Sequence, residues 1–291
     1  MSDGFYRAFE ERWRGSRELI KSRLRVYLPF VEPLRGLYPN PKALDLGCGR
    51  GEWLELLEEA GFNAEGVDLD DGMLAVCRQL GFKVQTQDAT GFLKSLPDTS
   101  HAVVSGFHLV EHIPFSELQQ LVEQALRVLQ PGGLLILETP NPENILVGTS
   151  GFYLDPTHQR PIPHQLLSFL PEYYGFTRIK ILLLQEQRGN SGDTQPTLLD
   201  VLGGVSPDYA VVAQKSVASE QMQLFDEAFN INYGLSLGVL AQQYEARLAL
   251  SEARSEYAES AVKEIKKSLP WRAWNWVKNK ASPLNSPREV P

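Results

Sequence analysis

The sequence predicts an α/β protein: a Rossmann-like, doubly wound and mostly parallel seven-stranded sheet with helices on both faces, followed by a C-terminal helical extension. Two observations predict this fold. Between residues 42 and 140, short apolar runs alternate with segments of helical periodicity, and such alternation is typical of βαβ units. Beyond residue 217 the chain is rich in Ala, Glu and Gln, and its periodicity is helical.

The N-terminal segment, residues 1–41, is predicted to be helical. Between Phe5 and Val31 apolar residues recur at helical spacings. Gly15 interrupts this pattern, and Ser16 is a suitable N-cap for the part that follows. The helical structure is expected to end at the prolines of this segment, which are Pro29, Pro33, Pro39 and Pro41.

The predicted α/β domain spans residues 42–216. Its strands are expected at residues 42–48, 63–70, 82–89, 101–110, 134–140, 176–184 and 208–215. Helices are expected at residues 51–61, 71–81 and 114–130. Residues 138–161 are interpreted as a long loop without regular structure, and loops of this length are usually functional.

The C-terminal extension, residues 217–269, is predicted to be helical and coiled-coil-like. Its apolar stripe is narrow and follows an imperfect heptad, made of Leu237, Leu240, Tyr244, Leu248, Ala253, Tyr257, Ala261 and Ile265. Two interpretations remain open. The helix packs against its own domain, or it mediates homo-oligomerisation or the docking of a partner protein.

The last segment, residues 270–291, is a basic tail rich in Trp. Residues 261–291 carry a net charge of +5, which leaves −13 for residues 1–260 out of a total of −8. The tail combines three tryptophans with three basic residues, as interfacial membrane segments do, and these are Trp271, Trp274, Trp276, Arg272, Lys278 and Lys280. A tail folded onto the protein, or a disordered tail, is the alternative. The acidic remainder argues against a nucleic-acid partner.

The composition also indicates where the protein works. Its only cysteines are Cys48 and Cys77, without a CxxC pair, which excludes a disulfide scaffold and fits a reducing compartment. The N-terminus has no signal-peptide core, and no stretch reaches the ~20 apolar residues of a membrane-spanning helix. We therefore expect a cytoplasmic protein, at most peripheral at the inner face of the membrane.

A glycine-rich loop follows the first strand of the α/β domain, in the sequence Asp45-Leu46-Gly47-Cys48-Gly49-Arg50-Gly51. Glycines permit a tight turn and a close approach of the backbone to a ligand. A dinucleotide loop has the pattern G-x-G-x-x-G, whereas this loop has Glu52 at the sixth position, where a pyrophosphate would lie. Asp45 ends the strand, and a carboxylate there suits an ammonium group.

The loop and the elements after it resemble class I S-adenosylmethionine-dependent methyltransferases. The resemblance rests on LDLGCGRG, GVDLD, QDA, FHLVEH and LQPGGLLILETP in this order and covers residues 43 to about 215. It implies that Asp68 binds the ribose hydroxyls and that Asp88 contacts the adenine amino group. The implied set of cofactor-binding residues is Asp45, Gly47, Cys48, Gly49, Gly51, Asp68, Leu69, Asp88, Ala89 and Phe107.

Two segments are candidates for the acceptor side, because ligands of open α/β sheets bind outside the carboxyl ends of the strands. They are residues 108–112, after the fourth strand, and residues 138–161, after the fifth. We predict His158 as the general base, with His112 and Glu111 as further catalytic candidates. A second set is suited to bind a hydroxyl-rich substrate, namely His108, Asn141, Tyr153, Asp155 and Arg160.

A metal site is the alternative interpretation of His108-Leu109-Val110-Glu111-His112. HxxEH resembles the ExxEH element of metal-binding small-RNA 2′-O-methyltransferases and ubiquinone-pathway O-methyltransferases, and His158 is a candidate for a further ligand. His108 replaces the first glutamate, so we predict no metal, although imidazole and carboxylate are competent ligands for a divalent ion. A structural role for Glu111 and His112, capping the next helix, also remains open.

Four further segments resemble a methyltransferase group of bacterial O-antigen and surface-glycan biosynthesis. They are residues 9–28, 138–144, 152–163 and 207–215, and members of that group often carry a coiled-coil helix and a segment like SLPWRAWNW. The resemblance implies O-methylation of a sugar hydroxyl. The alternatives are a methyltransferase for a small metabolite or RNA, and a non-catalytic scaffold module that binds the cofactor.

Overall fold

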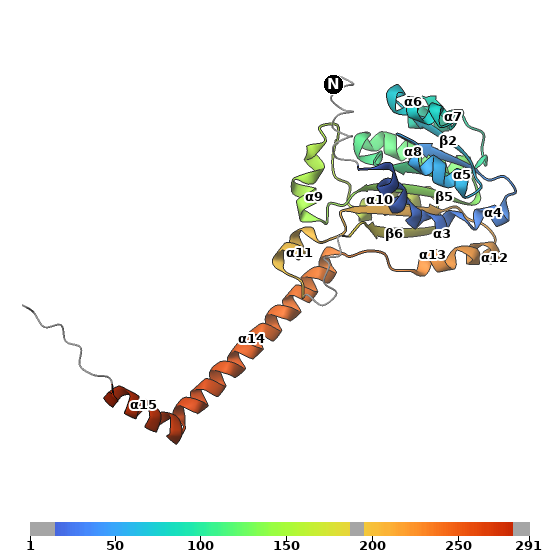
Figure 1. Cartoon of the computed structure of the whole chain (residues 1–291). Helices are drawn as coiled ribbons and strands as arrows, with labels where there is room; N and C mark the ends of the chain where they lie inside the picture. The colour runs from blue at the N-terminus through green and yellow to red at the C-terminus, as the bar shows by residue number, and fades with distance from the viewer. Residues whose placement is uncertain (1–14, 187–194, 282–291) are drawn as a thin grey trace, which may run out of the picture.

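The computed structural model describes residues 15–186 and 195–281, and a seven-stranded sheet lies at its centre (Figure 1). The strands are β1 (Lys42–Leu46), β2 (Asn63–Asp68), β3 (Lys83–Thr86), β4 (His101–Phe107), β5 (Leu129–Pro140), β6 (Arg178–Leu184) and β7 (Asp208–Gln214). Their order across the sheet is β3-β2-β1-β4-β5-β7-β6. β7 is antiparallel to both neighbours and every other pair is parallel, which confirms the predicted fold class.

Helices cover both faces of the sheet, and alternate strand residues face opposite cores. On β5, Leu134 and Ile136 belong to one core, whereas Leu135 and Leu137 belong to the other. The first core includes side chains from α2 (Arg17–Leu24), α3 (Leu28–Val31), α4 (Leu34–Leu37), α5 (Glu52–Glu59), α6 (Asp71–Gln79) and α13 (Asp226–Asn230). The second includes side chains from α7 (Ala89–Ser95), α8 (Phe115–Val128) and α10 (His164–Tyr174).

The N-terminal segment is helical, as predicted, from Arg17 onward. Ser16 caps α2, because its hydroxyl accepts a hydrogen bond from the backbone N–H of Leu19 at 3.2 Å. The prediction that Pro29 and Pro33 end the helical structure is wrong. Pro29 lies in the first turn of α3 and Pro33 is the N-cap of α4, where a missing N–H costs no hydrogen bond. The earlier part of the predicted helix lies outside the described residues.

Three short helices that depend on side-chain caps were not predicted from the sequence. Asp88 accepts from the N–H of Gly91 at 2.6 Å and starts α7, directly after β3. Asn144 caps α9 (Ile145–Thr149), and a 3₁₀ turn at Gly151–Leu154 follows. Thr197 and Asp200 form the capping box of α11 (Leu198–Gly203). The interpretation of residues 138–161 as a loop without regular structure is therefore wrong.

The C-terminal helices extend away from the α/β domain (Figure 1). After α12 (Ser219–Met222) and α13, the chain enters α14 (Leu237–Lys267), capped by Ser236, and then α15 (Leu269–Ala281). Leu240 is the one buried side chain of α14, so this helix does not lie along its own domain for most of its length. Within the described ranges, no helix combines the length and the hydropathy of a membrane span.

Candidate active site

The glycine loop joins β1 to α5 in a conformation that requires glycine. Gly47, Gly49 and Gly51 all have positive φ angles, of 67°, 53° and 78°. A Cβ atom on Gly51 would lie 3.0 Å from the Sγ atom of Cys77 and from a ring carbon of Phe82. Any residue other than glycine would therefore be strained in the loop. Cys77 and Phe82 pack closely against Gly51, and the lack of side chains on the glycines lets a ligand approach the loop backbone closely.

Two aspartates lie beside the loop, Asp45 on β1 and Asp68 on the neighbouring β2. One carboxylate oxygen of Asp68 accepts from the N–H of Gly49 at 2.8 Å, and the other accepts from the N–H of Asp70 at 2.8 Å. Asp45 is buried and accepts from the hydroxyl of Ser105 on β4 at 2.8 Å. The structure thus places Asp45 and Asp68, two of the three predicted cofactor carboxylates, at the carboxyl edge of the sheet, next to the loop.

The other predicted cofactor residues come from the same edge. Asp88 is the N-cap of α7, Ala89 is its first residue, and Leu69 follows β2 with 73% of its surface exposed. Phe107 ends β4, and its ring lies 5.2 Å from the ring of Tyr27. Because β3, β2, β1 and β4 are consecutive in the sheet, these residues border one continuous surface.

The two cysteines are buried, Cys48 in the loop and Cys77 on α6 behind it. The Cys77 thiol donates to the carbonyl oxygen of Gly49 at 3.3 Å. Contact with Cys77, together with burial, raises the pKa of the Cys48 thiol well above its usual range. Cys48 therefore stays a neutral thiol, and its side chain supports the loop.

The N-terminal helix α2 is fastened to the loop by charged groups. The Arg17 guanidinium donates to the carbonyl oxygen of Arg50 at 2.8 Å and pairs with Glu55 of α5. Glu52 is buried and pairs with Arg50 at 2.8 Å, so an arginine neutralises the carboxylate noted in the sequence. These contacts place α2 across one side of the cofactor edge.

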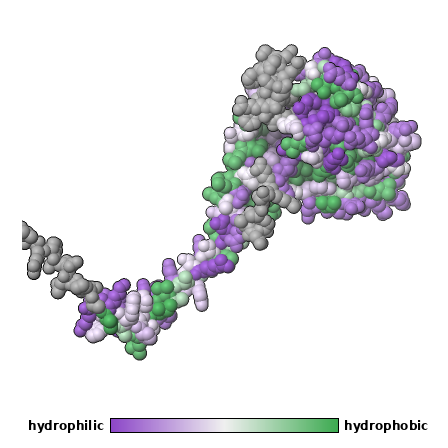
Figure 2. Space-filling view, in the orientation of Figure 1, coloured by the Kyte–Doolittle hydropathy of each residue, from purple (hydrophilic) through white to green (hydrophobic). Residues whose placement is uncertain are grey.

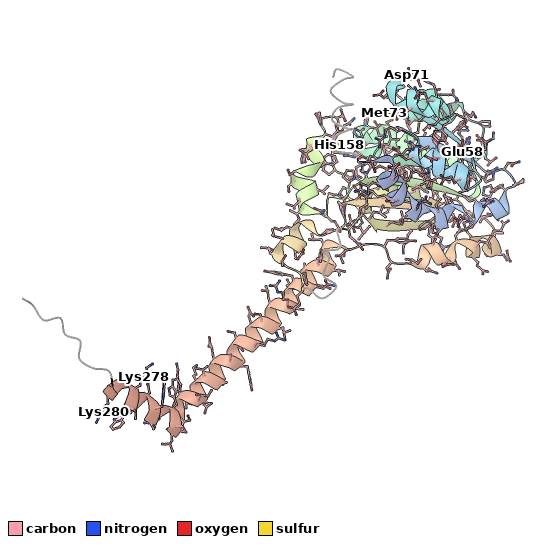
Figure 3. All side chains as sticks on the ribbon, in the orientation of Figure 1. Glu58, Asp71, Met73, His158, Lys278 and Lys280 are labelled. Carbon is pink, nitrogen blue, oxygen red and sulfur yellow. The ribbon has the colours of Figure 1, made fainter. Side chains whose placement is uncertain are left out.

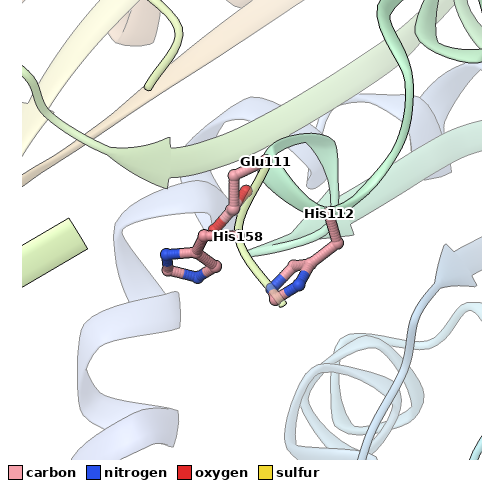
Figure 4. A group of neighbouring side chains, drawn as sticks. All are labelled: Glu111, His112 and His158. Carbon is pink, nitrogen blue, oxygen red and sulfur yellow. The ribbon is translucent and has the colours of Figure 1, made fainter. Parts of the chain in front are cut away.

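On the acceptor side, the structure brings together Glu111, His112 and His158, all three of the predicted catalytic residues (Figure 4). Each offers one oxygen or nitrogen atom, and these three atoms lie within 4.8 Å of one another. Glu111 is fully buried and accepts from the hydroxyl of Thr139 at 2.9 Å. The rings of His112 and His158 meet edge to face, with centroids 4.6 Å apart.

Hydrogen bonds determine the protonation of both imidazoles. Nδ1 of His158 lies 2.6 Å from the carbonyl oxygen of Phe152, which can only accept, so Nδ1 carries the proton. Nδ1 of His112 lies 2.9 Å from the hydroxyl of Thr157, whose single proton goes to Asp155 at 2.6 Å, so Nδ1 of His112 also donates. In the neutral imidazoles, each Nε2 therefore has a free lone pair.

Burial lowers the pKa of His112, and the neighbouring His158 lowers it further, against the opposing effect of Glu111. The neutral ring is thus favoured at neutral pH. Asp155 does not orient His158, because its nearer oxygen lies 3.9 Å from Nε2. The carbonyl of Phe152 has that orienting role, and Asp155 acts on His112 through Thr157.

His108 belongs to a second cluster, with Glu138 and Asp208. Its Nε2 atom lies 3.4 Å from Glu138 and 4.0 Å from Asp208, while its Nδ1 atom lies 3.2 Å from Glu111. The alternative metal set of His108, Glu111 and His112 is therefore not the one that the structure assembles. Loss of solvation lowers the pKa of His108, but Glu111 and Glu138 outweigh it and raise that pKa well above its ordinary value.

Three substrate-binding predictions have different outcomes. Asn141 is fully buried, and its amide donates to the carbonyl of Ser206 at 2.8 Å, so it has a structural role here. Tyr153 is exposed, and the exposed Arg160 lies over the ring of Phe115 at 4.6 Å. Sequence reasoning missed Glu138 and Asp208. The signal for Glu138 was its position in Glu138-Thr139-Pro140, at the end of an apolar strand.

A family model described as a methyltransferase domain matches residues 14–177, which is more than half of the chain. The chain belongs to this methyltransferase family. A solved S-adenosylmethionine-dependent methyltransferase from Archaeoglobus fulgidus is 34% identical, covers 72% of this chain and 100% of its own, and has a TM-score of 0.64.

Two curated relatives match the methyltransferase over a shorter range. The "Probable S-adenosylmethionine-dependent methyltransferase" of Mycolicibacterium smegmatis is 32% identical over 133 residues, 46% of this chain and 51% of that protein. The ubiquinone biosynthesis O-methyltransferase of Methylococcus capsulatus is 32% identical over 107 residues, 34% of this chain and 44% of that protein. The chain spans about half the length of these relatives.

The methyltransferase uses S-adenosylmethionine as its cofactor. The residues present fit that group, because the positive φ angles of Gly47, Gly49 and Gly51 make a tight turn without side chains at the carboxyl edge of the sheet, and because Asp45 suits the ammonium of its methionine part. The donor set Glu111, His112 and His158 would also fit a divalent cation, since two imidazoles and a carboxylate are competent ligands.

Proposed function

We propose that this enzyme is an O-methyltransferase that methylates a sugar hydroxyl during bacterial surface-glycan biosynthesis. The supporting observation is that His112 and His158 each use Nδ1 as a hydrogen-bond donor, which leaves Nε2 to accept a proton, and that both rings lie in one cluster with Glu111. A sugar hydroxyl is weakly acidic and reacts poorly as a nucleophile unless a base takes its proton. The O-methyltransferase named among the relatives agrees with transfer to oxygen.

Bound S-adenosylmethionine supplies an activated methyl group on a sulfonium. The residues of this chain have to hold cofactor and acceptor in line, and such positioning contributes about 7–11 kcal/mol in favourable cases. Asp45, Asp68 and the glycine loop would hold the cofactor. Asp88 would reach the adenine once the cofactor takes the place of solvent beside α7.

His158 is the proposed general base. Its Nδ1–H is anchored on the carbonyl of Phe152, so Nε2 is the atom that would take the hydroxyl proton while the oxygen–methyl bond forms and the sulfur–methyl bond breaks. Glu111 lies close to the imidazolium that results and stabilises it. His112 is the second candidate base, because its lowered pKa keeps it neutral. Of the predicted substrate residues, Tyr153, Asp155, Arg160 and His108 stay in the proposal.

A metal-assisted reaction is the second candidate. The observation that favours it is the set of three donor atoms within 4.8 Å, from Glu111, His112 and His158. Each of these side chains is oriented by another group, through Thr139, Thr157 and the carbonyl of Phe152, as ligands of metal sites usually are. A bound divalent ion would lower the pKa of the acceptor hydroxyl.

The deciding experiment uses purified protein, S-adenosylmethionine with a labelled methyl group, and a panel of glycans. The proposal expects label in a methyl ether on a sugar. Small phenols and RNA are tested beside the glycans. Label in either of them would show that the acceptor belongs to another chemical class. Tight cofactor binding without transfer to any acceptor would favour a scaffold module.

We further propose that helix α15 lies on the inner face of a membrane. Leu269, Trp274 and Trp276 are exposed on it, and Leu269–Ala281 contains basic but no acidic residues. Lys278 lies over the ring of Trp274 and Lys280 over that of Trp276, at 5.2 and 4.2 Å. Hydrophobic residues also gather where α14 meets α15 (Figure 2). Tryptophan with lysine is the usual composition of an interfacial helix.

The membrane contact would leave the α/β domain free to work. Lys278 and Lys280 lie at the opposite end of the molecule from His158 (Figure 3). The long helix α14 between them exposes most of its apolar stripe, so homo-oligomerisation or docking of a biosynthetic partner remains part of this proposal.

A further inference from the structure

Glu138 is the centre of a hydrogen-bond network that the proposed chemistry does not use. It lies near the carboxyl end of β5 and is 5% exposed. Its Oε2 atom accepts from the hydroxyl of Tyr27, and its Oε1 atom accepts from the side-chain amide of Gln185 at 3.2 Å. Nε2 of His108 lies 3.4 Å from the same Oε1 atom. Side chains from three remote segments thus fix this carboxylate.

Two of these partners have strained backbones. His108 and Gln185 have φ angles of 51° and 62°, and within the described ranges Thr99 is the only other non-glycine residue with a positive φ. Such conformations cost on the order of 1–3 kcal/mol each and persist mainly at functional sites. Both strained residues direct their side chains at Glu138. The backbone strain at His108 and Gln185 therefore indicates that the surroundings of Glu138 form a functional site.

A cavity of about 430 Å³ lies beside this carboxylate, between the N-terminal helices and the ends of β5 and β6. This volume is within the range of roughly 300–1,000 Å³ of small-molecule sites. Its polar lining includes Arg23, Glu138, Gln185 and Glu186, and its apolar lining includes Val26 and Tyr233.

We propose that this cavity is the acceptor pocket and that it binds a pyranose sugar. This inference rests on the proposed O-methyltransferase function and names its site. Carboxylates and an amide accept and donate hydrogen bonds to sugar hydroxyls, and the ring of Tyr233 offers a face for the apolar side of a pyranose. A flat phenol offers a single hydroxyl to this polar lining, whereas a pyranose offers several.

The pocket is connected to the proposed base through one side chain. His108 lies 3.4 Å from Glu138, at the cavity, and 3.2 Å from Glu111, in the catalytic cluster. Its imidazole therefore lies between the carboxylate at the cavity and Glu111 of the catalytic cluster. The acceptor hydroxyl reaches the base past His108.

The test uses the full-length protein saturated with S-adenosylhomocysteine. The probes are the methyl α-glycosides of glucose, galactose, mannose and rhamnose, and saturation-transfer NMR measures their binding. Val26→Trp fills the cavity, and Arg23→Gln removes its guanidinium. Val239→Trp and Arg25→Gln make the same changes outside the lining and serve as matched controls. Calorimetry with S-adenosylhomocysteine and the melting temperature verify that each variant is folded.

We expect at least one glycoside to bind the wild type and both controls. Binding should weaken at least roughly tenfold in Val26→Trp and Arg23→Gln, at unchanged cofactor affinity. Absence of glycoside binding to the wild type, or wild-type binding in Val26→Trp, overturns the pocket. If a glycan is methylated and its KM is unchanged in Val26→Trp, the pocket is wrong but the proposed function holds. If sugars bind the cavity but no sugar hydroxyl is methylated, the pocket holds and the proposed function is wrong.

Discussion

The imidazole of His158 is oriented by the backbone carbonyl of Phe152, six residues earlier in the chain, at 2.6 Å from Nδ1. Phe152 lies within the 3₁₀ turn Gly151–Leu154 and His158 lies beyond its end, and their rings are also in contact, with centroids 4.5 Å apart. The 3₁₀ turn thus positions the proposed base, His158. This is a structural role of the long segment after β5.

We predict that His158→Ala lowers the turnover number by ~10²–10⁴-fold, the usual contribution of a general base. The affinity for S-adenosylmethionine should be nearly unchanged, because His158 comes from the acceptor side. Single-turnover methyl transfer and calorimetry measure the two quantities. His164→Gln is the matched control, since His164 pairs with Glu143 outside the cluster. Near-wild-type single-turnover rates in His158→Ala would remove this residue from the mechanism.

Chelation separates the two mechanisms. If His158 acts as a base alone, exhaustive treatment with a chelator should leave the rate unchanged. If a divalent ion is required, activity should disappear and return with Mg²⁺ or Mn²⁺. In that case Glu111→Gln, His112→Ala and His158→Ala should each also reduce metal affinity measured by calorimetry, whereas His108→Ala should not, because His108 lies in the other cluster.

Asp68 provides the test of the cofactor site. Asp68→Ala should weaken S-adenosylmethionine binding by about 1.5–3 kcal/mol, the range for a hydrogen bond to a charged group. The variant also loses the bond to the N–H of Gly49 that shapes the loop. Asp71→Ala removes an exposed carboxylate just beyond and should leave binding unchanged. Equal calorimetric affinities for Asp68→Ala and the wild type would contradict the assignment.

The local features of the site could be predicted from the sequence, but its long-range contacts could not. The glycine loop, Asp45 and Asp68 were predictable, because strand ends and glycine spacing are visible in neighbouring residues. Tyr27 and Glu138 were not, since 111 residues separate them and no periodicity links an N-terminal helix to the end of the fifth strand. The caps of α7 and α9 were missed because each stabilises a helix too short to show an apolar period.

Glu65 should make stability depend on pH. The hydrogen bond from His101, opposed by burial and aided by Lys83, lowers the pKa of Glu65 to about 2. The folded pKa lies below the unfolded one, so this stabilisation is complete above about pH 4.5 and is lost as the pH falls toward 2. Glu65→Gln should cost about 2 kcal/mol of unfolding free energy at pH 7 and much less near pH 2. Urea unfolding at both values measures this difference, and an equal cost at both would contradict it.

Helix α15 should bind anionic membranes through its tryptophans and lysines. Trp274→Ala with Trp276→Ala removes two exposed rings, and Lys278→Glu with Lys280→Glu reverses two charges that lie over them. Both double variants should sediment less with phosphatidylglycerol vesicles, and wild-type binding should weaken with salt, because salt screens exposed charges beyond about 10 Å at 0.1 M. Tyr257→Ala, an exposed ring on α14, is the control and should sediment like the wild type. If both double variants sediment as the wild type does at low salt, α15 is not the membrane contact. Its exposed rings would then be expected to contact a protein partner.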